Sequence, residues 1–470
     1  MGAEMRQGQE IPHGKQSWYG PAGGIWQSVH LEIRARDHLA HCAIRTKNSG
    51  QIDLVLTGNG HAEWAIQGPD GTELVRGKAQ LSEAVPVATS IPNPRLWSPD
   101  DPALYSLTVT LSGDITRHSF GFREFIARDG QFFLNGKPFY MRGALDQDYY
   151  PETLGTPPSA AYIEDQFRKA RELGLNLLRC HIKIPDPVYY DIADRLGLLI
   201  WTEIPNVAEL TEASAGRLRA TMEGILARDG NHPSIVIWTL INEDWGTRLA
   251  EDASHRAWLK QLDPARLVVD NSPCHGNYHV KSDIDDYHYY RSLPERRAEW
   301  DALTREFSGR PGWTYTPHGD AQRTGKEPLV VSEFGVWGLP DPALVSVNGK
   351  EPWWMETGGT WGEGAAYPHG LRARFASLGL ARTFGSFPAY IAAAQTYQFA
   401  NLKYQIESMR AEAPIQGYVI TEFTDVHWES NGLLDMNRNK RSFHADFAAI
   451  NADTVILTGQ DRYAHWLGED

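Results

Sequence analysis

From about residue 131 onward, short apolar runs alternate with longer stretches of helical periodicity, and few folds accommodate such an alternation. Eight of the runs are predicted to be parallel strands: Phe139–Gly143, Asn176–His181, Leu198–Glu203, Ile235–Asn242, Leu267–Asn271, Ile284–Tyr289, Leu329–Glu333 and Gly417–Thr421. Helices are expected between them, at Ala160–Leu173, Val188–Leu196, Ala215–Asp229 and Ala389–Met409. Eight parallel strands with intervening helices indicate a (β/α)8 TIM barrel.

The preceding hundred or so residues have a different pattern, with short alternating runs separated by turn residues. Examples are Val29–Ile33, Ile52–Leu56, Ala62–Ile66 and Tyr105–Leu111, and no convincing helix lies among them. About seven such strands in this space favour an immunoglobulin-like β-sandwich. The predicted fold class is therefore multidomain β plus α/β, with the sandwich followed by the barrel.

Composition excludes several classes of partner and site. Lys and Arg total 45 against 59 Asp and Glu, and the net charge of −14 argues against nucleic acid and against an anionic membrane surface. The three cysteines contain no CxxC pattern, so neither a disulfide framework nor a cysteine zinc site is expected. The 16 tryptophans suit either sugar-stacking surfaces or an ordinary large core.

The N-terminus lacks a basic segment followed by an apolar run, which is the pattern of a signal peptide. No run is long enough to span a membrane as a helix. We therefore expect a cytoplasmic protein, or a periplasmic or secreted one if a further segment precedes Met1.

Two glutamates follow wholly apolar runs at predicted strand ends. Glu243 follows the fourth strand and Glu333 ends the seventh. Barrel active sites lie at the carboxyl ends of the strands, so the two carboxylates are expected at one rim. A single carboxylate there is most often a solvated loop residue, but a pair makes that interpretation much weaker.

Several segments in order resemble glycoside hydrolase family 2, which holds β-galactosidases, β-glucuronidases and β-mannosidases. Asn231–Glu243 resembles the acid/base strand of that family and Leu329–Gly335 its nucleophile strand. Gly121–Phe125 resembles its junction between sandwich and barrel, and Asn176–His181 its second barrel strand. The resemblance extends from about residue 13 to residue 456.

The family plan implies a division of the chain into four parts. Residues 1–23 would be a tail and the remnant of a sugar-binding jelly-roll domain, because Trp18–Trp26 resembles the join after that domain. Residues 24–125 would form the sandwich and 126–453 the catalytic barrel. Residues 454–470 would be the start of a further, truncated domain.

The resemblance implies hydrolysis of terminal β-linked sugars with retention, by double displacement between two carboxyl groups about 5–5.5 Å apart. Glu333 would be the nucleophile, and Glu243 would be the acid and base, with a raised pKa. Arg179 would hold Glu333 ionised, although a plain interior salt bridge is the alternative. Asn242 would bind the sugar 2-hydroxyl, and Tyr289 matches a tyrosine that contacts the nucleophile.

Further residues near the rim are candidate substrate-binding groups. Asp148 can bind sugar hydroxyls or cap a helix, and His181 and His288 can orient carboxylates or simply pack. Trp245 and Trp337 flank the two glutamates as candidate walls for the sugar, and Trp428 is a candidate replacement for the tryptophan that usually ends strand eight.

Departures from the family bear on the substrate. β-Glucuronidases carry an Asn-x-Lys pair before a Gly-apolar-apolar step, and no Lys precedes Asn431–Leu434 in this chain, although Arg438 and Lys440 follow it. A neutral or decorated sugar in a β-galactosidase-like site is thus favoured over a glucuronide or mannoside. Metal ligands of the magnesium-dependent β-galactosidases are not reproduced, so no metal or cofactor is expected.

The alternatives to an active glycosidase are a non-catalytic carbohydrate-binding relative and an inactive fragment. Homo-oligomers are common in the family.

Overall fold

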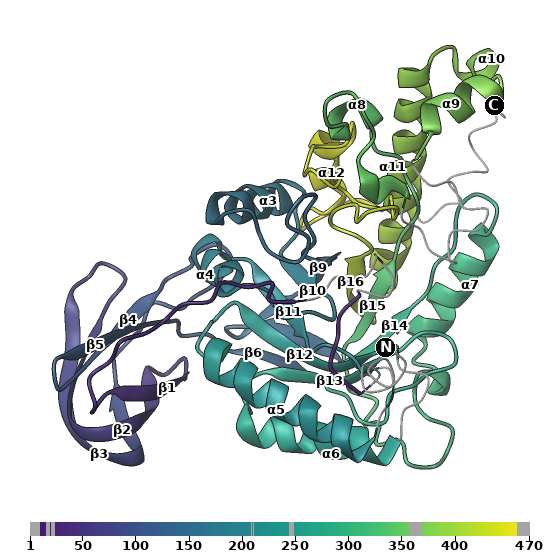
Figure 1. Ribbon diagram of the computed structural model, residues 1–470. Helices are drawn as coiled ribbons and strands as arrows, with labels where there is room; N and C mark the ends of the chain where they lie inside the picture. Colours follow the sequence, from purple (N-terminus) through teal and green to yellow (C-terminus); the bar gives the residue numbers. More distant parts are fainter. Residues whose placement is uncertain are drawn as a thin grey trace.

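The computed structural model describes residues 10–15, 19, 24–207, 209, 211–243, 249–356 and 369–457. A β-domain lies to one side of an eight-stranded barrel whose helices surround it (Figure 1). The expected combination of sandwich and TIM barrel is therefore confirmed. Among the helices of the described part, none has the length and apolar character needed to cross a membrane.

The β-domain is built on one long hairpin. Its strands are β1 (Leu39–Thr46), β2 (Gln51–Gln67), β3 (Glu73–Ser90), β4 (Tyr105–Leu111) and β5 (Asp114–Phe120). β3 pairs with β2 along its whole length, while the other edge of β2 pairs first with β1 and then with β4. Alternate residues of β1, β2, β4 and β5 point into one shared apolar core.

Two details of the predicted sandwich are wrong. The runs Ile52–Leu56 and Ala62–Ile66 were expected as separate strands, but both belong to β2. The glycines between them resemble a turn in sequence, yet Gly58 has no side chain to clash with the carbonyl of His38, so the strand continues past it. Val29–Ile33 forms no strand, and its apolar side chains are exposed.

A three-stranded antiparallel sheet connects the two domains. It consists of β6 (Phe125–Arg128), β7 (Gln131–Leu134) and β8 (Lys137–Phe139). Phe125 and Phe132 from this sheet are buried in one cluster with inward side chains of the barrel strands. The small sheet thus supplies part of the barrel's interior packing.

All eight predicted barrel strands are present, with bounds that differ by a few residues. They are β9 (Met141–Asp146), β10 (Leu177–Cys180), β11 (Leu199–Glu203), β12 (Ile235–Asn242), β13 (Leu267–Ser272), β14 (Asp285–His288), β15 (Leu329–Phe334) and β16 (Ile415–Ile420). The parallel order runs β13-β12-β11-β10-β9-β16-β15-β14. His288 donates its backbone N–H to Pro273 carbonyl at 2.9 Å, which brings the two ends of this order together.

Helices cover the outside of the barrel (Figure 1). They are α3 (Ala160–Glu172), α4 (Pro187–Leu196), α5 (Glu212–Asp229), α6 (Leu249–Leu262), α7 (Arg297–Ser308), α8 (Pro342–Val345), α9 (Leu371–Ser377), α10 (Ala381–Phe384), α11 (Phe387–Ala411) and α12 (His444–Ile450). Capping side chains define where several begin, as Ser159 does by accepting the backbone N–H of Tyr162.

The sandwich is attached to the start of β12 by hydrogen bonds. The Asn231 side chain donates to Cys42 carbonyl and accepts from Ile44 N–H, each at 2.8 Å. Arg123, just after the sandwich, donates to the carbonyls of Pro233 and Ile235 at 3.0 and 2.8 Å. The strand that leads to Glu243 is therefore held at its beginning by the β-domain.

Candidate active site

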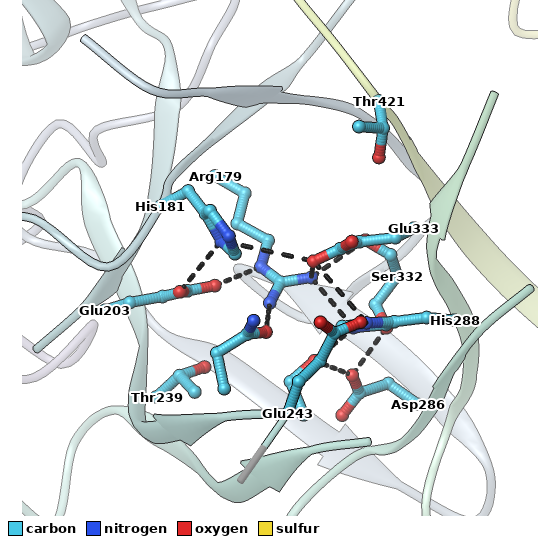
Figure 2. A network of polar contacts seen from close by, with 12 residues as sticks. Arg179, His181, Glu203, Thr239, Glu243, Asp286, His288, Ser332, Glu333 and Thr421 are labelled. Atoms are coloured by element: carbon cyan, nitrogen blue, oxygen red, sulfur yellow. Dashed lines mark hydrogen bonds and ion pairs between the residues drawn. The ribbon is translucent and has the colours of Figure 1, made fainter. Parts of the chain in front are cut away.

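Glu243 and Glu333 lie together at the carboxyl ends of β12 and β15, as the sequence predicts (Figure 2). The backbone of Glu243 is left-handed, with φ of +51°, and its N–H donates to Ser272 carbonyl at 3.0 Å. A left-handed glutamate is strained and needs such support from its surroundings. The turn places the carboxylate next to the strand ends rather than out in solvent.

The two carboxyl groups are close enough to act on one bond. One oxygen of Glu243, one of Glu333 and a ring nitrogen of His288 all lie within 4.8 Å of one another. Among the described residues, these three form the one His, Cys, Asp and Glu cluster with such spacing. The three side chains lie against one another, and Arg179 lies beside Glu333 and His288, so they form one cluster of acid–base groups.

Arg179 on β10 is the buried cation of the site. Its Nη1 lies 3.4 Å from Glu333 Oε1, and its Nη2 donates to Asn242 Oδ1 at 2.7 Å. Its Nε is paired with Glu203, a buried carboxylate whose pKa burial alone would raise. The charges of Arg179 and His181 instead lower the pKa of Glu203 to about 2. Arg179 thus joins Glu333, Asn242 and Glu203 in one network (Figure 2).

Two histidines complete the network. His181 Nδ1 lies 3.0 Å from Glu203 Oε2 and 4.0 Å from Glu333 Oε1. His288 Nδ1 lies 2.7 Å from Glu243 Oε1 and 3.5 Å from Glu333 Oε1. Both therefore contact catalytic-site carboxylates, which favours the orienting role over simple packing.

The electrostatics of Glu243 differ from the expectation of a raised pKa. Burial does act to raise the pKa of this carboxyl. The hydrogen bond with His288 and the charges of His288, Lys15 and His181 together outweigh burial, and they leave the pKa of Glu243 below its usual range. The ligand-free geometry thus pairs Glu243 with His288 instead of isolating the carboxyl in an apolar pocket.

Tyr290, and not Tyr289, contacts Glu333, the predicted nucleophile. The Tyr290 hydroxyl donates to Glu333 Oε2 at 2.8 Å and lies 3.0 Å from Thr421 Oγ1. Tyr289 points the other way, with its ring against Trp300 and its hydroxyl 3.2 Å from Thr304. The prediction was wrong by one residue because pairing between β14 and β15 is irregular after Tyr287, and such a shift exchanges the two faces of a strand.

The close approach of β15 and β16 depends on a glycine. A Cβ on Gly335 would lie 2.1 Å from the carbonyl oxygen of Thr421, so no larger residue fits beside the nucleophile strand. Thr421 N–H donates to Phe334 carbonyl at 2.7 Å across this contact. The arrangement brings the Thr421 hydroxyl within reach of Tyr290.

Asp148 does not face the catalytic pair with a free carboxylate. One oxygen lies 2.6 Å from Lys183 Nζ, and the other accepts the Tyr150 hydroxyl at 2.5 Å. The residue is fully buried. The structure thus gives Asp148 a buried ion pair at the end of β9, and the predicted role in binding sugar hydroxyls is not supported.

Two of the three candidate tryptophans lie together. The rings of Trp337 and Trp428 are stacked, with centroids 5.8 Å apart and planes inclined by 19°. Trp428 is buried, whereas 43% of Trp337 is exposed, so Trp337 presents an open aromatic surface four residues after Glu333. Trp245 lies outside the described residues.

Sequence reasoning missed the polar residues beneath the catalytic pair. Ser272 at the end of β13, Asp286 on β14 and Ser332 on β15 are buried, and both serines are hydrogen-bonded to Asp286. The sequence does contain a sign of these residues, because polar side chains within otherwise apolar barrel strands need hydrogen-bond partners inside the barrel. Lys15, which acts on Glu243 from the N-terminal segment, carried no comparable signal.

Comparisons with known proteins point to one enzyme family. A family model described as "Glycosyl hydrolases family 2, TIM barrel domain" matches residues 125–342, and "Glycosyl hydrolases family 2" matches residues 28–123. "Beta-galactosidase 2" of Enterobacter cloacae is 29% identical over 282 residues, which are 52% of this chain and 27% of that protein. A "Beta-galactosidase" of Aeromonas hydrophila subsp. hydrophila is 30% identical over 280 residues, with the same coverage.

Solved structures show the same fold at lower identity. β-Glucuronidase 3 of Bacteroides uniformis superposes with a TM-score of 0.71 and 18% identity, covering 95% of this chain and 56% of that one. A Ruminococcus gnavus β-glucuronidase in complex with D-glucuronic acid superposes with a TM-score of 0.65 and 17% identity, covering 88% of this chain and 67% of that one. The chain matches about a quarter of the length of its curated relatives. From the two family models and the β-galactosidase relatives, the chain belongs to glycoside hydrolase family 2.

Proposed function

We propose that this chain hydrolyses terminal β-linked sugar residues with retention of anomeric configuration. The observation that carries the proposal is the spacing of Glu243 and Glu333, whose nearest oxygens lie within 4.8 Å. Inverting enzymes keep their carboxyl groups about 6.5–9.5 Å apart to admit a water molecule between them. The spacing of the nearest oxygens is closer to the separation of about 5–5.5 Å in retaining enzymes, and it supports direct attack by one carboxylate.

In the proposed reaction, Glu333 attacks the anomeric carbon while Glu243 protonates the departing oxygen. The C1–O bond to the leaving group breaks and an ester bond to Glu333 forms. Water then attacks the same carbon, and Glu243 accepts its proton as the ester bond breaks. Arg179 stabilises Glu333 as an anion before attack, and Asn242, held by Arg179, is positioned to bind the sugar 2-hydroxyl.

A neutral sugar fits the surroundings better than a uronate. Arg438 lies against Tyr150 and donates to Gln166, and Lys440 is paired with Glu172, so both cations are already committed. Directly after β16, the pKa of buried Glu422 is raised well above its usual range by burial and by neighbouring carboxylates. The carboxyl groups here supply no cation that could pair with a uronate at this end of β16. We therefore propose a β-galactoside-like substrate.

A panel of aryl β-glycosides tests this assignment. We expect hydrolysis of a β-galactoside or another neutral glycoside to exceed that of the glucuronide by about tenfold or more, with the β-anomer released first in proton NMR. Preferential turnover of the glucuronide would overturn the substrate class, and release of the α-anomer would overturn retention. Sugar binding without any turnover between about pH 5 and 8 would identify a carbohydrate-binding relative instead.

Tyr290→Phe removes one hydrogen bond from the nucleophile. We expect kcat to fall by about 10- to 100-fold with little change in KM, because a hydrogen bond to a charged group is lost while the sugar-binding groups remain. Steady-state kinetics on one aryl glycoside measure the effect. Tyr289→Phe is the matched control and should lose far less activity; the reverse order would contradict the assignment.

A further inference from the structure

A chain of buried polar groups extends from Glu243 into the barrel. His288 Nδ1 lies 2.7 Å from Glu243 Oε1, and the other ring nitrogen, Nε2, lies 2.8 Å from Ser272 Oγ. The Ser272 hydroxyl in turn donates to Asp286 Oδ2. Figure 2 shows Glu243, His288 and Asp286 together in this network. Ser272 belongs to β13, and Asp286 and His288 belong to β14, so the barrel strands themselves hold the chain in place.

The direction of these hydrogen bonds follows from proton counting. Asp286 Oδ2 accepts the hydroxyls of both Ser272 and Ser332, the latter at 2.5 Å. Because the single hydroxyl proton of Ser272 is used on Asp286, Ser272 Oγ can only accept from His288. The 2.8 Å contact thus assigns the Nε2 proton to the bond with Ser272, in preference to acceptance from Arg179 Nη1 at 3.4 Å, and leaves Nδ1 facing Glu243.

A second histidine lies beside Asp286. His279 Nε2 lies 3.5 Å from Asp286 Oδ1, and His279 Nδ1 lies 2.8 Å from Asp270 Oδ1. Burial alone would lower the pKa of His279, but Asp270 and Asp286 raise it to about 9. Asp286 thus lies beside a histidine whose pKa is raised, and it accepts the two serine hydroxyls on its other oxygen.

We propose that Ser272 and Asp286 are positioning residues that confine one mobile proton to the contact between His288 Nδ1 and Glu243. The inference rests on the proposed function for its role in catalysis, but the proton arrangement itself does not. His288 is then the store from which Glu243 is supplied as an acid. Neither Ser272 nor Asp286 touches the sugar in this scheme.

The proton balance closes over both steps. The shared proton passes from Nδ1 through Glu243 to the leaving oxygen as the glycosidic bond breaks, leaving neutral His288 and ionised Glu243. The attacking water returns a proton to Glu243, and it is again shared with Nδ1. No other donor is needed, and the low pKa of Glu243 in the free structure does not obstruct acid catalysis.

Other charged groups around the pair act in both directions. Arg179 Nη1 lies 3.4 Å from His288 Nε2 and opposes a second positive charge, whereas Glu333, 3.5 Å from Nδ1, favours it. Lys15 and His181 also act on Glu243 and lower its pKa. Cys274 is nearby as well, and burial and Glu243 raise the pKa of its thiol to about 12, so it stays neutral. Tyr290 remains a neutral donor to Glu333.

Ser272→Ala tests the positioning role, with Ser332→Ala as its matched control. Both serines are buried and both donate to Asp286 Oδ2, but only Ser272 contacts His288. Losing the acceptor of the Nε2 proton should move the alkaline limb of kcat/KM down by about one pH unit. Ser272→Ala should lower activity about 10-fold or more on a methyl glycoside. The loss should be far smaller on a dinitrophenyl glycoside, whose leaving group departs without protonation by an acid. Ser332→Ala should keep the wild-type pH profile.

Histidine-labelled ¹⁵N NMR of the whole chain gives a readout without substrate. We expect the His288 signal, assigned by its loss in His288→Asn, to show protonated Nε2 at every pH, with Nδ1 titrating and that titration shifting in Glu243→Gln. A wild-type His288 protonated on Nδ1 alone would overturn the proposal, as would equal pH shifts in the two serine variants. A chain with the expected NMR signals but no glycoside turnover would overturn the proposed function and leave the proton arrangement established.

Discussion

Glu333→Gln is expected to lower kcat/KM on aryl glycosides by about 10⁴- to 10⁶-fold, since the amide cannot form the glycosyl ester. The substitution is nearly isosteric, and although Arg179 and Tyr290 contact different oxygens of Glu333, the amide oxygen can still accept from one of them. Structural damage should therefore be small, and the melting temperature should stay close to wild type. Steady-state kinetics and thermal unfolding together separate the two effects.

Covalent trapping makes this test independent of rates. A 2-fluoro glycoside with a good leaving group slows the second step, so the wild-type peptide that contains Glu333 should gain the mass of one fluorosugar. Glu333→Gln should gain none. Glu295→Gln, an exposed residue before α7, is the control and should be labelled like wild type. Label on another carboxylate would contradict the nucleophile assignment.

Glu243→Ala is expected to show a loss that depends on the leaving group. Alkyl glycosides, which need protonation, should lose about 10²- to 10⁴-fold in kcat/KM, while dinitrophenyl glycosides should form the glycosyl-enzyme at a rate near wild type. Because no base then activates water, this intermediate should accumulate and appear as a burst of nitrophenolate.

Azide supplies the matching control for Glu243. A small anion can enter the space left by the carboxylate and attack the intermediate without a base, so azide should restore turnover and yield a β-glycosyl azide. Glu333→Gln should not respond in this way. An equal loss of activity on all leaving groups, or an α-glycosyl azide, would show that Glu243 is not the acid and base.

The barrel could be predicted because each strand is a compact apolar run between helical segments. Buried parallel strands carry no alternation, so runs such as Ile235–Asn242 stand out against the amphipathic helices. The two glutamates were found for the same reason, since a carboxylate directly after such a run must lie at the rim. The β-domain was harder, because glycines inside β2 resemble those of a turn.

Side-chain direction was less predictable than strand position. Choosing between Tyr289 and Tyr290 required the local irregularity between β14 and β15, which depends on pairing with another strand. The pKa of Glu243 likewise depends on His288 and Lys15, which lie 45 positions after it and far before it in the chain. Such effects arise from contacts distant in sequence and leave no local pattern.

The bonds from Asn231 and Arg123 have a consequence for protein engineering. They join the β-domain to the residues that lead into β12, and the other end of that strand leads to Glu243, the proposed acid and base. The two domains are therefore poorly suited to exchange between relatives. In a chimera joined between them, residues 231–235 would face a foreign β-domain, and any misfit there would shift β12. Residues 231–235 should travel with the sandwich when segments of relatives are shuffled.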